Sequence, residues 1–308
     1  MTFELSPSES IEEGIRRAVS GEIETALEQC RLDPKAKDGA RAVAVHEVRK
    51  CLKRIRAALR LVRDELGEPV YRKENARFRD AARPLTEVRD AQVLVGTLDS
   101  LALTPPSEPI RDALLGRERA VVRRVLLEGH AFDGVRDALE RALARVPTWK
   151  IEHDGWEALE GGVRRVYRAG RAALALAEAS PTVENLHELR KQAKYMWHLL
   201  QLVQSGRPDD GLVEHAHELS RTLGDDHDLA VLRQAVQADP ETYGSGRERE
   251  RLFSVIDHRR EELGARSLLG GRKFYAARPR DFAHRVQRHF SALPDPTPSL
   301  PRARPRTS

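Results

Sequence analysis

The sequence predicts an all-α fold made of two similar helical bundles. Apolar residues recur at spacings of three and four along most of the chain, which is the period of one helix face. Aromatic residues make up only 5% of the 308 residues and charged residues 33%, a composition that suits helices with broad solvated faces better than the strands of a β-sandwich. The motif beginning at His46 recurs at His187, which indicates that the second half of the chain repeats the first.

Charge and cysteine content narrow the class of protein. The 53 Lys and Arg against 48 Asp and Glu give a net charge of +5, too small for this length to indicate an anionic partner without a local concentration. Cys30 and Cys51 cannot form a disulfide framework or a four-cysteine metal site. No stretch approaches the roughly 20 apolar residues of a membrane span, and the start of the chain is acidic, unlike a secretory signal. We therefore expect a cytoplasmic protein with no membrane partner.

The first helices are indicated by a cap and by an apolar stripe. Ser10 and Glu13 predict a capping box, and the helix that it opens is expected to run to about Arg31. Residues 43–66 predict a long second helix, which Gly67 is expected to end. Its apolar stripe consists of Val45, Val48, Leu52, Ile55, Leu59 and Val62.

Prolines divide the rest of the first half. A third helix is expected to reach about Arg83, to be interrupted at Pro84 and to resume over residues 85–100. Residues 101–106 are expected to form a linker. Residues 108–145 predict one or two further helices.

The second half follows the same plan. A helix is expected over residues 155–179, and Ser180 and Pro181 supply a cap and a first-turn proline for the next helix, which Gly206 ends. Residues 209–222 predict another helix. The apolar stripe of the capped helix consists of Leu186, Leu189, Ala193, Met196, Leu200 and Val203.

A glycine is expected to interrupt the following segment. We expect a break at Gly224 and a new helix over residues 225–237. Helices near 247–266 and 279–292 complete the ordered part. The proline-rich basic tail over residues 293–308 is expected to be disordered.

The internal repeat aligns two sets of basic residues. His46-Glu-Val-Arg-Lys50 recurs as His187-Glu-Leu-Arg-Lys191, an offset of 187 − 46 = 141, and Lys53 is matched by Lys194. The repeat predicts a single domain spanning residues 1–308, built from a four-helix bundle over 10–146 and a second helical bundle over 152–292 that are pseudo-symmetric.

A second aligned pair lies further along each half. Arg89-Asp90 is matched by His227-Asp228 at an offset of 228 − 90 = 138, and at that offset Arg79 and Arg83 correspond to His217 and Arg221. Arg89 and His227 are expected near the starts of helices, where free backbone amides favour an anion. Each bundle is therefore expected to carry a basic face in the same place.

Helical spacing arranges the basic residues in rows. His46, Arg49, Lys53, Arg56 and Arg60 step by three and four, so their Cβ atoms lie about 5–6 Å apart beside the apolar stripe. Like charges in such a row repel, and a bound polyanion would offset the repulsion through charge-assisted hydrogen bonds. The candidate polyanion-binding residues are His46, Arg49, Lys50, Lys53, Arg56, Arg60, Arg79, Arg83, Arg89, His187, Arg190, Lys191, Lys194, His217, Arg221 and His227.

The segments that carry these rows resemble a known family. HEVRKCLKRIRAALRLV with VRDAQVL, followed by LHELRKQAKYMWHLL with LGDDHDLAVL, resemble the CHAD family, the conserved histidine α-helical domain, over about residues 10–290. The resemblance implies two pseudo-symmetric bundles around a central basic cleft or pore that binds inorganic polyphosphate without catalysis. It assigns binding to His46, Arg49, Lys50 and Lys53 and their counterparts His187, Arg190, Lys191 and Lys194. Trp197 and His198 depart from the Arg and Tyr-like residues more frequent there.

Three other functions remain as alternatives. Nucleic acid is the second polyanion, although the few aromatic residues are not interleaved with the basic rows as base stacking requires. A protein-interaction scaffold is the third. A metal site at His227 with Asp226 and Asp228 is the fourth; the zinc-protease motif is absent because Lys50 and Lys191 stand where its second histidine belongs. We therefore expect a non-enzymatic, cofactor-free polyphosphate-binding module associated with polyphosphate granules, whose site phosphate or sulfate could also occupy.

Overall fold

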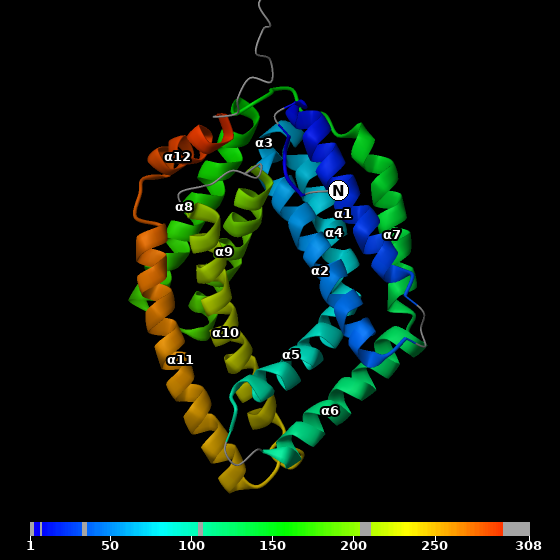
Figure 1. Cartoon of the computed structure of the whole chain (residues 1–308), viewed down its shortest axis with the longest axis vertical. Helices are drawn as coiled ribbons and strands as arrows, with labels where there is room; N and C mark the ends of the chain where they lie inside the picture. Colours follow the sequence, from blue (N-terminus) through cyan, green and yellow to red (C-terminus); the bar gives the residue numbers. More distant parts are fainter. Residues whose placement is uncertain (1–2, 7, 33–35, 104–106, 204–210, 292–308) are drawn as a thin grey trace, which may run out of the picture.

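The predicted all-α class is confirmed by a computed structural model of the chain (Figure 1). The structure describes residues 3–6, 8–32, 36–103, 107–203 and 211–291, and within these ranges it contains helices and no strand. The tail over 293–308 and the expected helix end at Gly206 lie outside the described residues.

The first half of the chain forms seven α-helices among the residues described. They are α1 (Ile11–Cys30), α2 (Asp38–Leu61), α3 (Arg63–Leu66), α4 (Glu68–Ala82), α5 (Thr86–Ser100), α6 (Glu108–Val122) and α7 (Ala131–Arg145). Short non-α turns connect some of them, at Arg83–Leu85, Arg123–Glu128 and Val146–Thr148.

The second half forms longer helices. They are α8 (Glu157–Ala179), α9 (Val183–Val203), α10 (Leu212–Ala238), α11 (Gly246–Phe274) and α12 (Pro279–Ser291).

Several expected helix boundaries are confirmed. Ser10 Oγ accepts from the Glu13 backbone amide at 3.3 Å, while the Glu13 carboxylate accepts from the Ser10 amide at 3.1 Å, which completes the capping box of α1. Gly67, with φ of +72°, separates α3 from α4. Pro84 lies in the non-α turn between α4 and α5, as expected. Both apolar stripes, on α2 and on α9, are buried.

Several expected boundaries are wrong. The helix expected over 43–66 begins at Asp38 and is interrupted at Val62, so α2 and the short α3 replace it. Gly224 does not break α10, because a glycine inside a long, packed helix costs only about 1 kcal/mol relative to alanine. Ser180 does not cap α9; that helix begins at Val183, and Thr182 Oγ1 accepts from the Asn185 amide at 3.2 Å. The helix expected to end near residue 266 continues to Phe274.

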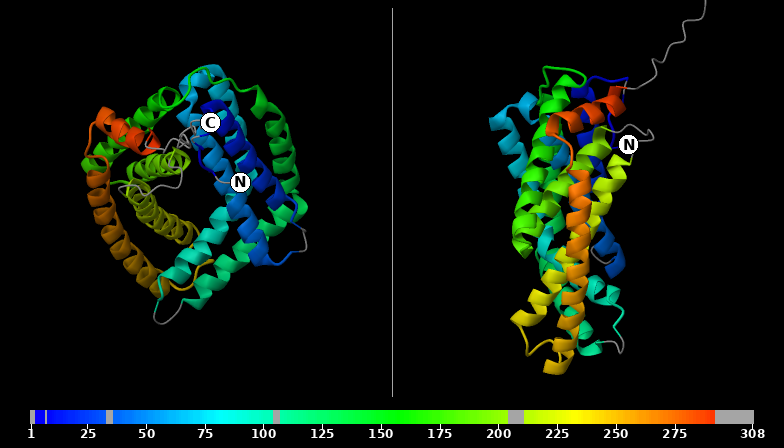
Figure 2. Two further views of the ribbon diagram at one scale, coloured as in Figure 1. Left: turned by 45° about the horizontal axis from the view of Figure 1, so that its top comes forward. Right: turned by 90° about the vertical axis from the view of Figure 1, so that its left-hand side faces the viewer.

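The helices divide into two groups that face each other. In Figure 1, α1, α2, α4 and α7 lie on one side and α8 to α12 on the other, with α5 and α6 crossing below them. The left-hand view of Figure 2 keeps this division, and in its right-hand view α11 runs along much of the length of the molecule. None of the described helices is both long enough and apolar enough to span a membrane.

Two apolar cores hold these groups together. The larger core joins residues of both sequence halves, among them Leu52 and Ile55 of α2 and Leu189 and Met196 of α9. The smaller core joins α5 and α6 to α10 and α11. As a result α2, α5, α9 and α10 form a closed circuit of contacts: α2 with α5, α5 with α10, α10 with α9, and α9 with α2.

Candidate functional site: a basic cavity among α2, α5, α9 and α10

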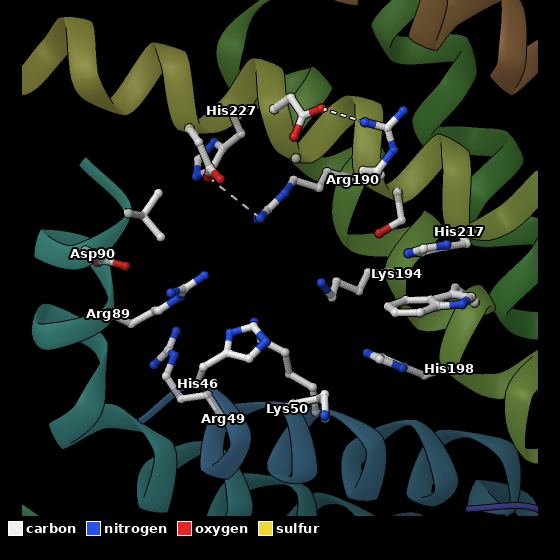
Figure 3. A pocket seen from close by; sticks show the side chains of 18 of the residues that line it. His46, Arg49, Lys50, Arg89, Asp90, Arg190, Lys194, His198, His217 and His227 are labelled. Atoms are coloured by element: carbon white, nitrogen blue, oxygen red, sulfur yellow. Dashed lines mark hydrogen bonds and ion pairs between the residues drawn. The ribbon is translucent and has the colours of Figure 1, made fainter. Parts of the chain in front are cut away.

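A cavity of about 390 Å³ lies within this circuit, and all of its lining residues come from its four helices (Figure 3). The lining includes ten of the candidate residues, from both halves of the chain: His46, Arg49, Lys50, Lys53, Arg89, Arg190, Lys194, His217, Arg221 and His227. It is completed by Asp90, Val93, Trp197, His198, Ser220, Gly224, Asp225, Asp228 and Val231.

The helix period explains how α2 supplies four of these side chains. Val48 and Leu52 face the larger core, so His46, Arg49 and Lys53, at spacings of three and four, lie on a neighbouring face of the same helix. On α9, Arg190 and Lys194 are four residues apart and share a face for the same reason. The contact of α2 with α9 brings the two faces to one cavity.

Two lysines reach the cavity without a carboxylate to neutralise them. Lys53 of α2 and Lys194 of α9 make no ion pair with any described Asp or Glu within 4 Å. Burial, and secondarily the ammonium of Lys194, lowers the pKa of Lys53 to about 7. Burial, and secondarily the guanidinium of Arg190, lowers the pKa of Lys194 to about 8. Each ammonium is held where water and counter-charge are scarce.

Three arginines surround these lysines. Arg49 donates from Nη1 to Thr86 Oγ1 at 2.7 Å and to the Ala82 carbonyl at 3.3 Å, which joins α2 to the start of α5. Its Nε is buried and without a partner, as is the Nε of Arg190, whose Nη2 lies 3.9 Å from Asp228. Arg89 makes no ion pair with a described carboxylate within 4 Å. Arg89 therefore retains guanidinium donors that an anion in the cavity could satisfy.

Carboxylates balance only part of this charge. Burial raises the pKa of Asp90 against the opposing effect of Arg49, and it raises the pKa of Asp228 against the opposing effect of Arg190. Asp225 is committed to Arg221, with Oδ2 3.3 Å from its Nη1. The cavity thus carries more positive than negative groups.

The histidines contribute less charge than the lysines. Burial, and secondarily Arg190, lowers the pKa of His227 to about 4, so its ring is neutral near pH 7. Its Nδ1 lies 3.2 Å from Nδ1 of His187, whose pKa burial also lowers. Partial burial and the charge of Arg89 lower the pKa of His46. These rings act as neutral hydrogen-bonding groups in the free protein.

Six candidate residues do not line the cavity. Arg56 donates to Asn75 at 3.0 Å, and the guanidinium of Arg60 lies 3.8 Å from the ring centroid of Tyr195. Arg79 and Arg83 are exposed and pair with Asp80. The two others are His187, whose ring contacts that of His227, and Lys191, which pairs with Glu188. Of the row expected along α2, His46, Arg49 and Lys53 therefore line the cavity, and Arg56 and Arg60 do not.

An aromatic stack closes one wall of the cavity. The rings of His198 and His217 each lie 4.5 Å from the ring of Trp197, and Figure 3 shows the two histidines on opposite sides of an indole. His198 is buried; its Nδ1 lies 3.0 Å from Gln201 Oε1, and its Nε2 has no partner. Burial lowers the pKa of His198 to about 3.

The continuity of α10 explains why Gly224 and Val231 line the cavity. His217, Arg221, Gly224, Asp228 and Val231 are spaced by four, three, four and three, which is one face of an unbroken helix. Expecting a break at Gly224 concealed this face, so Gly224 and Val231 were not candidates. The helix start expected near His227 is wrong as well, because His227 lies in the middle of α10. Free backbone amides at a helix start therefore do not contribute to an anion site there.

The lining chemistry suits an oxyanion. Its groups are mainly hydrogen-bond donors with positive charge, and they converge from four helices on one volume. Among the described residues, no three His, Cys, Asp or Glu side chains gather as metal ligands would.

One comparison, with models of known protein families, gives a match. The model of the CHAD domain family matches residues 23–237, a shorter span than the resemblance over about 10–290. The matched span contains every residue that lines the cavity. A search of the curated proteins finds no match to the chain.

Proposed function

Because the chain belongs to the CHAD domain family, we propose that its cavity binds inorganic polyphosphate. Linear polyphosphate carries a negative charge on each internal phosphate and exposes oxygen atoms that accept hydrogen bonds. Guanidinium and ammonium groups are the side chains that hold such oxyanions most strongly in proteins. The proposed ligand contacts are Arg49, Lys53, Arg89, Arg190 and Lys194, with the neutral histidines as further donors.

The two lysines without a carboxylate partner carry this proposal. Exposed arginines such as Arg221 and Arg259 have an acidic partner, whereas Lys53 and Lys194 face one cavity from two helices with no described carboxylate within 4 Å. Two partly buried ammonium groups that make no ion pair with a carboxylate are unfavourable in the free protein. A phosphate chain between them would supply the missing negative charge, so the cost is offset only when the ligand is bound.

We further propose that the module binds polyphosphate without cleaving it, and that this binding recruits the protein to polyphosphate granules. The cavity groups hold charge and donate hydrogen bonds. Incubation of the pure protein with long-chain polyphosphate, followed by gel analysis of chain length, tests the first part. Shortening of the chains that a Lys53→Glu, Lys194→Glu variant does not produce would overturn it.

Nucleic acid is the second candidate ligand, and the aromatic stack disfavours it. Single-stranded nucleic acid is held by bases that stack on exposed aromatic faces. Apart from histidines, Trp197 is the one aromatic residue among the described residues that line the cavity. Its faces are covered by the rings of His198 and His217. A base would have to displace a histidine before it could stack.

Calorimetry with matched charge variants tests the site. Polyphosphate, single-stranded DNA, duplex DNA and RNA are titrated at two salt concentrations, and we expect polyphosphate to bind most tightly. The variant Lys53→Glu, Lys194→Glu should lose at least about 100-fold in affinity, since two attractive contacts become repulsive. The variant Lys73→Glu, Lys150→Glu has the same net charge change at exposed positions outside the cavity and should bind nearly as the wild type does. Equal losses in both variants would place the site elsewhere.

A further inference from the structure

Lys53 combines three features that an amine nucleophile needs. It lines a cavity, it has no carboxylate partner within 4 Å to hold its proton, and Lys194 opposes its charge from the facing helix. Only the uncharged amine attacks a carbonyl carbon, and burial beside another cation is an established way to expose it. With a pKa of about 7, a large share of Lys53 is uncharged near neutral pH, whereas an exposed lysine is almost wholly protonated.

The neighbours of Lys53 decide which electrophile can approach it. The charged side chains that influence Lys53 come from α2, α5 and α9: Arg49, Arg89, Asp90, Arg190 and Lys194. Their balance is positive, so a neutral electrophile gains nothing from the cavity and an anionic one is concentrated there. The guanidinium of Arg89, which has no described carboxylate within 4 Å, is suited to phosphate oxygens.

A small acyl phosphate satisfies both requirements, since it joins a phosphate group to a reactive carbonyl. We propose that Lys53 is a self-acylation site for small acyl phosphates, whose phosphate group is held by Arg49, Arg89 and Arg190 beside the amine. The inference rests on the proposed function only in requiring that the cavity binds phosphate groups.

The reaction balances without any further reactant. The Nζ lone pair of Lys53 attacks the carbonyl carbon, and a carbon–nitrogen bond forms. The bond from that carbon to the phosphate oxygen breaks, and inorganic phosphate leaves with the bonding electrons. The nitrogen loses one proton, which passes to phosphate or water, and an amide remains. The arginines assist by stabilising the charge on the departing phosphate.

Acylation of Lys53 would weaken the binding of a polyanion in the cavity. The amide carries no charge, so a phosphate chain loses one ammonium contact at a partly buried position. The acyl group also occupies part of a cavity of about 390 Å³. We therefore expect the acylated protein to bind polyphosphate at least about tenfold more weakly than the unmodified protein.

The test uses the full-length wild-type protein with acetyl phosphate as the probe at pH 7.5. Peptide mass spectrometry follows the acetylation rate of each lysine. We expect Lys53 to react at least about tenfold faster than Lys73 and Lys150, which are exposed and outside the cavity. Pyrophosphate should suppress the reaction at Lys53 and leave the two reference lysines unchanged. A rate at Lys53 no greater than at those lysines overturns the proposal.

A neutral acetyl donor separates this proposal from the proposed function. The probe is p-nitrophenyl acetate, which has no phosphate group. If the selectivity for Lys53 is greater with acetyl phosphate than with the ester, the result supports binding of the phosphate group in the cavity. If the selectivity is equal for the two donors and pyrophosphate does not reduce it, the proposal is overturned. If calorimetry shows tight polyphosphate binding while Lys53 is not preferentially acetylated, this inference alone fails. If Lys53 is acetylated preferentially but polyphosphate does not bind, the proposed function fails.

Discussion

Lys53 illustrates how a proposed binding residue can lower the stability of the free protein. Its ammonium is placed among other cations in a partly buried position, where neither water nor a carboxylate stabilises it fully. An uncompensated charge of this kind destabilises a folded state, and an apolar replacement of similar size often stabilises it. Stability and ligand affinity therefore oppose each other at this position.

Lys53→Met should accordingly raise Tm while weakening binding. Methionine keeps most of the length of the side chain and removes the charge, so we expect Tm of the ligand-free protein to rise by about 2 °C or more. Affinity for polyphosphate should fall about tenfold or more, because one charge-assisted contact is lost. Scanning calorimetry and titration calorimetry measure the two effects. Lys73→Met is the exposed control, and a lower Tm for Lys53→Met than for this control would contradict the argument.

The lysine pair also predicts a pH dependence of stability. Lys53 and Lys194 have pKa values of about 7 and 8 in the folded protein, below the ordinary lysine value of 10.5. Between those values and 10.5 the unfolded chain binds more protons, so the two lysines make the free energy of unfolding rise with pH in this window. Below about pH 7 both states are protonated and the destabilisation is complete. Urea unfolding at pH 7 and pH 9 should show a smaller increase for Lys53→Met than for the wild type.

Polyphosphate binding should depend on pH in the opposite sense. A bound polyanion raises the pKa of both lysines, because it favours their charged forms. The complex therefore takes up protons, and affinity decreases as pH rises above about 7. Calorimetry at pH 8 in two buffers of different ionisation enthalpy measures the uptake directly. Binding without proton uptake would show that the lysines do not contact the ligand.

The contact of α8 with α2 depends on a single glycine. A Cβ atom at Gly162 of α8 would lie 1.9 Å from the backbone carbonyl oxygen of Leu61, at the end of α2. A backbone atom cannot move aside as a flexible side chain can, so the two helices would have to separate. Because α2 carries Arg49 and Lys53, this close approach helps position one wall of the cavity against the second half of the chain.

Gly162→Ala should therefore destabilise the protein by about 3 kcal/mol or more, since overpacking against backbone is costly. Gly96 of α5 is the matched control: it is exposed, and a Cβ there meets nothing within 4 Å. Gly96→Ala should stabilise the protein by up to about 1 kcal/mol through helix propensity. Urea unfolding of both variants checks this pair. Similar values for the two would show that helix propensity, and not the approach to Leu61, determines the effect.

Helix formation along α2 and α9 could be predicted because local rules govern it. The apolar stripes containing Val48 and Leu189 have the helical period, and both are fully buried. The continuity of α10 could not be predicted in the same way. Gly224 weakens a helix by propensity alone, but packing of α10 against α9 and α11 outweighs that small cost. The sequence contains the local signal without the tertiary contacts that override it.

The candidate site was predictable where residue spacing determines direction, and not where packing does. The repeat located Lys53 and Lys194, and the structure brings both to one cavity. Arg56 and Arg60 continue the same row by spacing, yet they turn to Asn75 and Tyr195 outside it. The sequence does not reveal where two helices diverge, so it does not indicate where a row along one of them leaves the cavity.

The enclosure of the site by four helices predicts how binding should respond to salt. A linear polyanion that replaces counterions with protein cations loses affinity in proportion to the number of contacts, with a slope of about 0.7 per contact for a flexible single strand. The contacts counted here are the cavity cations that have no carboxylate within 4 Å, and Arg190. At about 0.7 per contact, they imply a slope of roughly −3 to −4 in a plot of log affinity against log salt. The set is Arg49, Lys53, Arg89, Arg190 and Lys194.

Removing two of these contacts should change that slope by a defined amount. Lys53→Gln with Lys194→Gln should make it shallower by roughly 1.4, while Lys73→Gln with Lys150→Gln should leave it unchanged because those lysines are exposed outside the cavity. Titrations at four salt concentrations between about 50 and 300 mM determine both slopes. A lower affinity at an unchanged slope would mean that the two lysines maintain the shape of the cavity rather than contact phosphate. Contact predicts that affinity and slope change together.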